Sequence, residues 1–176
     1  MKKGNYYFIK MGSDPEILRK ILVMTFDDSY LKDIGEIITK KRMRTIEDTG
    51  YINFENKDRN IIYTFLSNQI LRTWYHHFPG TYGVIIINEG INPHDNMNEI
   101  SNLLNSKILI KRPFLIVYDK KRILEKDNKH MEYLRYVLSS KQVIYNVIYI
   151  DFKVNHLNSE LLYGLDWLNK QIMKII

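Results

Sequence analysis

Two clusters of polar residues in this sequence are close enough to suggest catalysis or metal binding. One is the pair His76 and His77, and the other is the acidic group Asp27, Asp28 and Asp33. The histidines have no cysteine and no acidic residue at ligand spacing, and the acidic group lacks the spacing and the glycine of a calcium-binding loop. We therefore interpret the histidines as structural or surface residues and Asp27 or Asp28 as the N-cap of a helix, and we expect no metal.

A third cluster is basic and consists of Lys40, Lys41, Arg42 and Arg44. Such a run is typical of a solvated loop, but it also has the composition of a docking patch for anionic membrane headgroups or an acidic protein. The net charge of +6 favours anionic partners in general. Because the sequence contains no recognisable nucleic-acid-binding motif, we expect no nucleic acid partner.

The composition limits the class of protein. The chain has 176 residues, of which 45% are hydrophobic and 26% charged, and this fits one globular domain over 1–176. The absence of cysteine excludes disulfides, thiolate chemistry and lipidation through sulfur. No apolar run approaches the ~20 residues that a membrane-spanning helix needs. We expect a cytoplasmic protein, with peripheral attachment to membranes as an option.

Short strand-like runs alternate with helical stripes along the chain, and these elements must position any site. Apolar or alternating runs predict strands in the second half of 17–24 and over 51–55, 60–66, 83–88, 113–118 and 143–150. Helical spacing of apolar residues predicts helices over 28–40, 93–106, 127–139 and from Ser159 to the C-terminus. The second and third strands flank a turn at 56–59 and form a hairpin.

This order of elements predicts an α/β fold of three layers. Its sheet is mostly parallel, with one antiparallel hairpin strand. Ligands of such sheets bind at the carboxyl ends of the strands.

Two stretches of the sequence are similar to the ADP-ribosylation factor (Arf/Arl) family of small GTPases. Leu-Arg-Thr-Trp-Tyr-His-His-Phe at 71–78 resembles the second switch helix of that family, and Leu-Tyr-Gly-Leu-Asp-Trp-Leu at 162–168 resembles its C-terminal helix. A weaker match at 45–51 resembles the first switch. The resemblance covers nearly the whole chain and implies a P-loop small-GTPase-like domain with a six-stranded sheet. It argues for fold and ancestry rather than for activity.

The phosphate-binding loop of this family, G-x-x-x-x-G-K-[ST], has no counterpart here. Its glycines let backbone amides surround phosphate, its Lys meets the β- and γ-phosphates, and its hydroxyl binds magnesium. Two alignments are open, and each replaces all four residues. The replacements are Thr25, Tyr30, Leu31 and Lys32 in one alignment and Met24, Ser29, Tyr30 and Leu31 in the other.

Asp28 adds an electrostatic obstacle to nucleotide binding. An acidic side chain about 4 Å from a phosphate costs on the order of 4 kcal/mol at an effective dielectric constant near 20. Asp27 is less informative, because the family's own loop carries an acidic residue nearby.

The other nucleotide motifs of the family have also changed. The second switch, D-x-x-G-Q, is replaced by a segment in which Ser67 and Gln69 stand beside Asn68, and Asp48 occupies the position of the metal-binding Thr in the first switch. In the base-reading motif N-K-x-D, Lys121 keeps the Lys beside Lys120, but Ile123 replaces the Asp that reads guanine. The last motif, S-A-K, aligns with 151–153, where Lys153 alone matches.

The resemblance therefore implies an Arf-like pseudo-GTPase that binds no cofactor, does not hydrolyse GTP and acts as a protein-interaction module, with a link to vesicle or membrane trafficking. The family reads effectors through an aromatic patch between the hairpin and the second switch. Carried over to this chain, the patch is Tyr51, Phe54, Leu66, Trp74 and His77. We expect this surface to be held in one state without a nucleotide. Two alternatives stay open: an Arf-like protein that binds GTP through non-standard contacts, and a structural subunit of a larger complex.

Overall fold

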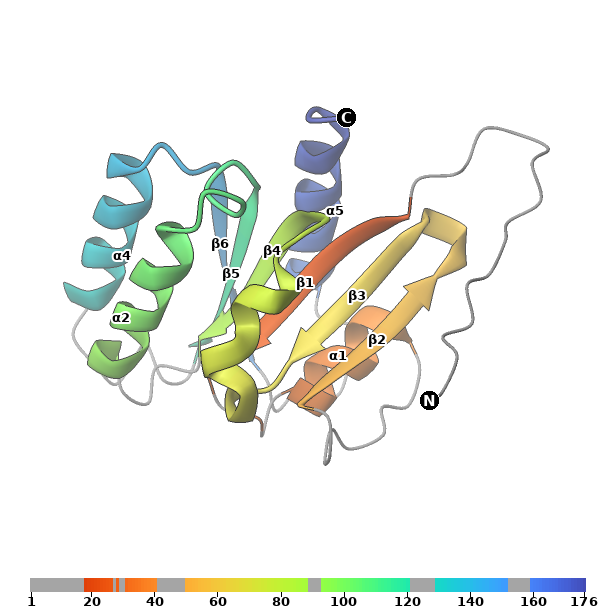
Figure 1. The fold of residues 1–176 in the computed structure, drawn as a ribbon, viewed down its shortest axis with the longest axis horizontal. Coiled ribbons are helices and arrows are strands. Elements are labelled where there is room, and N and C mark those ends of the chain that lie inside the picture. The colour runs from red at the N-terminus through yellow and green to blue at the C-terminus, as the bar shows by residue number, and fades with distance from the viewer. Residues whose placement is uncertain are drawn as a thin grey trace, which may run out of the picture.

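A computed structural model describes residues 18–26, 28, 31–40, 50–88, 93–120, 129–151 and 159–176. Within these ranges the chain forms a central sheet covered on both faces by helices (Figure 1). None of the helices in these ranges is both long and apolar enough to cross a bilayer.

The six-stranded sheet has the order β2-β3-β1-β4-β5-β6. Its strands are β1 (Arg19–Thr25), β2 (Tyr51–Asn56), β3 (Ile61–Leu66), β4 (Thr81–Asn88), β5 (Phe114–Asp119) and β6 (Tyr145–Ile150). The β2–β3 pair is antiparallel and every other pair is parallel, as the sequence predicted. The register places Met24 of β1 beside Leu66 of β3 and Ile86 of β4, so these strands end at one edge of the sheet.

Helices cover the two faces of the sheet in separate groups. The helical elements are α1 (Leu31–Thr39), η2 (Lys57–Arg59), η3 (Asn68–His77), α2 (Pro93–Leu104), α4 (Lys129–Ser140) and α5 (Ser159–Met173). α1 and α5 pack on one face, and η3, α2 and α4 pack on the other (Figure 1). This arrangement confirms the predicted three layers.

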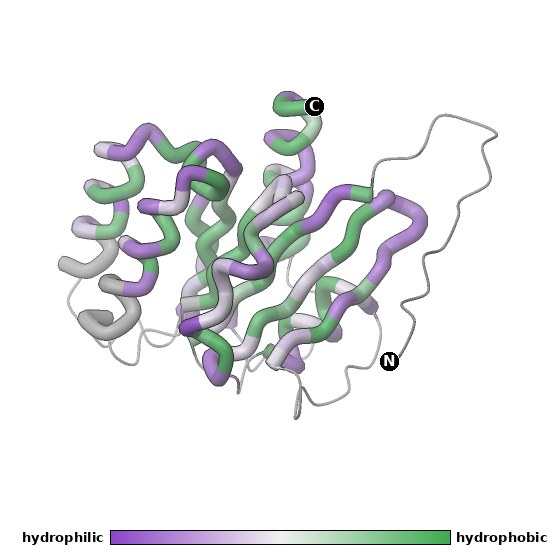
Figure 2. The backbone as a smooth tube through the Cα atoms, in the orientation of Figure 1, coloured by the Kyte–Doolittle hydropathy of each residue, from purple (hydrophilic) through white to green (hydrophobic). Residues whose placement is uncertain are grey.

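The hydrophobic core has two halves, one on each side of the sheet. The half under η3, α2 and α4 contains Leu22, Met24, Leu66 and Trp74, and the half under α1 and α5 contains the alternate residues of the same strands. Central strands are buried on both faces, and this explains their continuous apolar sequences. In Figure 2 the middle of the sheet is hydrophobic, whereas the turn between β2 and β3 is hydrophilic.

α5 approaches the sheet closely at Gly164. A Cβ atom at Gly164 would lie 2.9 Å from Cδ1 of Ile148 and 3.0 Å from Cδ1 of Leu115. A glycine is therefore needed here for close packing and not for backbone conformation. It belongs to the Gly-Leu-Asp-Trp-Leu segment that carries the sequence resemblance.

The structure differs from the prediction at two helices: one begins later than predicted, and the other is of a different helix type. The first helix begins at Leu31, three positions after the predicted start at Asp28. The segment that resembles the second switch helix is a 3-10 helix with non-helical backbone angles at Ile70.

We predict that Gly164→Val lowers the free energy of unfolding by about 1–3 kcal/mol, because the added methyl groups overpack the contact with Ile148 and Leu115. Urea denaturation followed by circular dichroism measures this change. Leu162→Val, at an exposed position of the same helix, is the control and should cost only a few tenths of a kcal/mol. Equal effects of the two variants would contradict the close-packing role of Gly164.

Candidate functional site

Ser67 joins several segments at the carboxyl edge of the sheet. It follows β3 and is buried, with 1% of its surface exposed. Its N–H donates to the carbonyl of Gly50 at 2.9 Å, and its hydroxyl accepts the N–H of Gln69 at 3.1 Å. Its own carbonyl accepts the indole N–H of Trp74 at 2.9 Å. Ser67 thus ties the residue before β2 to η3 on both sides of its kink at Ile70.

Asp28 connects to this network from the segment between β1 and α1. One oxygen of its carboxylate accepts the hydroxyl of Ser67 at 2.5 Å, and the other accepts the N–H of Asn68 at 3.0 Å. Charge-assisted hydrogen bonds of this kind are stronger than neutral ones. The carboxylate of Asp28 therefore holds the start of η3, and the N-cap role of Asp27 or Asp28 stays a prediction.

Gly50 packs directly against η3. Its φ of +67° lies in the left-handed region, which favours glycine. A Cβ atom at Gly50 would lie only 2.1 Å from Cγ2 of Ile70, the residue at which η3 is kinked. The first strand of the hairpin is thus fixed on the 3-10 segment by both a hydrogen bond and a close contact.

The described positions that align with the phosphate-binding loop are occupied in other ways. Met24 and Thr25 are fully buried at the end of β1, and Leu31 is buried in the core beneath α1. Lys32 is exposed on α1. Leu31 therefore cannot do the work of a phosphate-binding lysine, because its side chain is apolar and points into the core.

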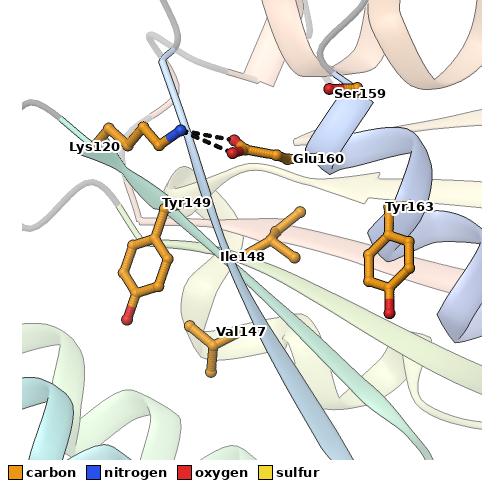
Figure 3. A pocket seen from close by; sticks show the side chains of 7 residues that line it. All are labelled: Lys120, Val147, Ile148, Tyr149, Ser159, Glu160 and Tyr163. Carbon is orange, nitrogen blue, oxygen red and sulfur yellow. Dashed lines mark hydrogen bonds and ion pairs between the residues drawn. The ribbon is translucent and has the colours of Figure 1, made fainter.

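Lys120 follows β5, where the family reads the base. Its ammonium group contacts both carboxylate oxygens of Glu160 in the first turn of α5, at 2.8 and 3.1 Å (Figure 3). Both side chains are about half exposed, so the pair contributes no more than about 1 kcal/mol. The pair borders an open cavity of about 430 Å³, which is also lined by Val147, Ile148, Tyr149, Ser159 and Tyr163.

The described residues at the carboxyl edge of the sheet do not fit a magnesium–nucleotide complex bound in the way that Arf/Arl GTPases bind it. The carboxylate of Asp28 takes the N–H and O–H donors at the start of η3, and in one of the two alignments the lysine position is an apolar core residue, Leu31. Gln69 is exposed, and its backbone N–H donates to the hydroxyl of Ser67, the N-cap of η3. Nine of the sequence-predicted site residues lie outside the described ranges: Asp27, Ser29, Tyr30, Lys41, Arg42, Arg44, Asp48, Lys121 and Ile123.

Two residues of the expected effector surface lie together on the outside of the molecule. The rings of Tyr51 and His77 are 4.7 Å apart and tilted by 53°, and 39% of Tyr51 is exposed. Lys20 donates to the carbonyls of His77 and Pro79 and so holds the end of η3. Burial is the main cause that lowers the pKa of His77, and the charges of Lys20 and then His76 lower it further. Burial also lowers the pKa of Lys20.

The other three residues of the expected surface are not part of it. Leu66 and Trp74 are buried in the core under η3, so the prediction that they face a partner is wrong. Phe54 lies on the opposite face of the sheet from Tyr51, where it packs edge-on against Phe65 beneath α1. Its position three residues from Tyr51 in a strand requires this, because side chains alternate between faces.

The roles of Asp28, Ser67 and Lys20 were not predictable from sequence patterns. Asp28 and Ser67 are separated by 39 positions, and Lys20 and His77 by 57. The one available signal was an acidic residue at a phosphate-binding position, which indicated what is excluded but not what the carboxylate holds.

The fold is similar to solved structures of small GTPases. The structure of an ADP-ribosylation factor-like GTP-binding protein, the small COPII coat GTPase Sar1 from Encephalitozoon cuniculi with GDP, matches 89% of this chain and 81% of its own, at a TM-score of 0.60 and 12% identity. The Arl6 (BBS3) small GTPase from Trypanosoma brucei with the analogue GppNp matches 89% of this chain and 98% of its own, at a TM-score of 0.64 and 14% identity.

Comparison by sequence identifies no relative. No protein-family description and no curated protein sequence matches the chain. The six-stranded sheet, its single antiparallel pair and the two helical layers agree with the structural matches along most of the chain. The protein therefore has the fold of the Arf/Arl small GTPases.

Proposed function

We propose that this protein is an Arf-like pseudo-GTPase that acts as a protein-interaction module and does not hydrolyse GTP. The single observation that carries the proposal is the pair of hydrogen bonds from Asp28 to Ser67 and Asn68. In a nucleotide switch, the γ-phosphate and its magnesium order the switch segments, and hydrolysis releases them. Here a carboxylate of the chain itself orders the segment that aligns with the second switch.

A fixed internal acceptor changes what the surface can do. Asp28 is covalently part of the chain and is not released, so the Ser67 network has no hydrolysis step to weaken it. The start of β2 and η3 are held together by the Gly50–Ser67 hydrogen bond and the Gly50–Ile70 contact. This supports a surface that stays permanently in one state.

The proposed partner site is the surface formed by Tyr51 and His77. Aromatic residues that are partly exposed are common anchors of protein interfaces. The lowered pKa of His77 keeps its imidazole neutral at neutral pH, which limits the desolvation cost of burying it under a partner.

A role in membrane traffic and a cytoplasmic location belong to the proposal. They are supported by the sequence resemblance and by the shared fold, one example of which is a coat GTPase by name. Attachment to an anionic membrane would use the basic run that includes Lys40, which is exposed and has a left-handed φ of 54° at the end of α1. The rival function, GTP binding through non-standard contacts, makes the opposite prediction for the following experiment.

We predict that the purified protein carries no guanine nucleotide and that its melting temperature does not change with GTP or GDP and magnesium. A ligand at a thousand times its dissociation constant would stabilise the fold by about 4 kcal/mol, which is about 8–16 °C for a domain of this size. The measurements are anion-exchange chromatography of the denatured supernatant and a melting curve. Nucleotide in the supernatant, or a rise of several degrees, would refute the pseudo-GTPase proposal.

We predict that Asp28→Asn destabilises the protein by about 1–2 kcal/mol, because Ser67 loses a charged acceptor for its hydroxyl. Chemical denaturation gives the change, and amide hydrogen exchange should show faster exchange in η3. Asp58→Asn, which alters an exposed carboxylate in η2, is the matched control. If the two variants are equally stable and η3 exchanges as in the wild type, Asp28 does not hold the segment.

We predict that His77 makes the protein less stable in mild acid. Its pKa in the folded state is lowered, so the unfolded chain takes up the proton first as the pH falls below about 6.5. The contribution is therefore complete above about pH 6.5 and is lost as the pH falls toward the folded pKa. Urea denaturation at pH 7.5 and 5.5 should show a larger loss for the wild type than for His77→Gln. His76→Gln is the control, and the same pH response in the wild type and His77→Gln would contradict the assignment.

A further inference from the structure

Within the described residues no strand lies beside the outer edge of β6, and this edge has the properties of a strand-pairing surface. β6 is the last strand in the sheet order, and the carbonyl of Ile144 just before it accepts the N–H of Phe114 in β5. Backbone groups of successive residues point to opposite sides of a strand. The N–H and C=O groups of Tyr145, Val147 and Tyr149 therefore point away from β5. Val147 and Tyr149 also line the open cavity, where Figure 3 shows their side chains.

β6 lacks the charged residues and the proline that commonly protect sheet edges. Its sequence, Tyr-Asn-Val-Ile-Tyr-Ile, contains no charge, no proline and no glycine. Exposed edge strands are normally blunted by charged side chains, proline or bulges, because their unpaired groups are a template for another strand. The opposite edge strand, β2, does carry a charge, Glu55, which is exposed.

One feature moderates this edge. The N–H of Val147 donates to Oδ1 of Asn146 at 2.9 Å, so a side chain occupies the central donor of the edge. A pairing strand has to displace this amide and replace one hydrogen bond by another. The side-chain amide of Asn146 therefore protects the edge from non-specific strand pairing, and a specific partner strand can displace it.

The surroundings of the edge are aromatic and electrically balanced. Tyr149 and Tyr163 stand on opposite sides of β6 (Figure 3), and Tyr136 and Tyr163 are 71% and 67% exposed. Near the edge, Lys120 forms an ion pair with Glu160, and Arg135 donates to the hydroxyl of Tyr149 at 3.4 Å, with the acidic Glu132 on the same helix. In a chain with a net charge of +6, this is a region where two copies can approach without strong repulsion.

We propose that β6 pairs with β6 of a second copy of this chain, antiparallel and about a two-fold axis at Val147. The strand is nearly self-complementary about that residue, as a two-fold interface requires. Tyr145 of each copy then lies opposite Tyr149 of the other, and aromatic cross-strand pairs stabilise antiparallel strands. The two sheets join into one, and the proposed partner surface at Tyr51 and His77 stays free, because β2 forms the opposite edge of the sheet.

Sedimentation velocity of the full chain at a series of concentrations tests this pairing. We expect a dimer at about 0.1 mM that dissociates on dilution, as weak interfaces do. Val147→Pro removes an N–H that takes no part in the β5 ladder, so the fold should persist. Val147→Pro should raise the dissociation constant of the dimer about tenfold or more. Tyr163→Lys, at an exposed position, should do the same by bringing a new positive charge to the interface in each copy. Asn146→Val should strengthen the dimer, because it removes the competing amide.

Glu55→Pro is the matched control on the opposite edge. The N–H of Ser67 donates to Gly50, so by alternation the N–H of Glu55 points away from β3, and its loss should leave the dimer unchanged. A chain that is monomeric at every concentration would overturn the proposal, even if its β6 edge captured another protein. A dimer that Glu55→Pro disrupts and Val147→Pro does not would also overturn it. If circular dichroism shows that Val147→Pro is unfolded, Tyr163→Lys decides the outcome.

Discussion

The hydrogen bond between the carboxylate of Asp28 and the hydroxyl of Ser67 is the interaction on which the candidate site depends. Ser67 is buried and makes further hydrogen bonds to Gly50, Gln69 and Trp74. Its hydroxyl accepts from Gln69 and must donate to an acceptor, and Asp28 supplies a charged one. This network fixes where the hairpin and η3 meet, and hence the neighbouring rings of Tyr51 and His77.

The site is rigid because the core beneath it is rigid. Trp74 donates its indole N–H to Ser67, and its ring packs 5.6 Å from that of Phe26, at the end of β1. A fully buried indole whose N–H is satisfied leaves η3 little freedom to shift. The two surfaces of interest, at Tyr51 and along β6, lie at opposite edges of one sheet that this core holds together.

The fold could be predicted from the sequence because its signals are local. Apolar strands and helical stripes gave the order of elements, and the segment around Gly164 indicated the family fold. The candidate site could not be predicted equally well, because burial depends on contacts between distant segments. Trp74 and Tyr75 lie on the same short helix, yet the former faces the core and the latter faces solvent. Phe54 was predicted to share a surface with Tyr51, but it lies on the opposite face of the sheet because side chains alternate along β2.

The sequence by itself determined the α/β layering and the hairpin, since both follow from residue types at fixed spacing. Only the tertiary structure decided which side chains meet at the carboxyl edge of the sheet. Asp28 and Ser67 come from segments far apart in the chain, and their hydrogen bond exists because the parallel pairing of β1 and β3 brings the ends of both strands to one edge. A linear pattern cannot encode that meeting, because it records neighbours along the chain and not across the sheet.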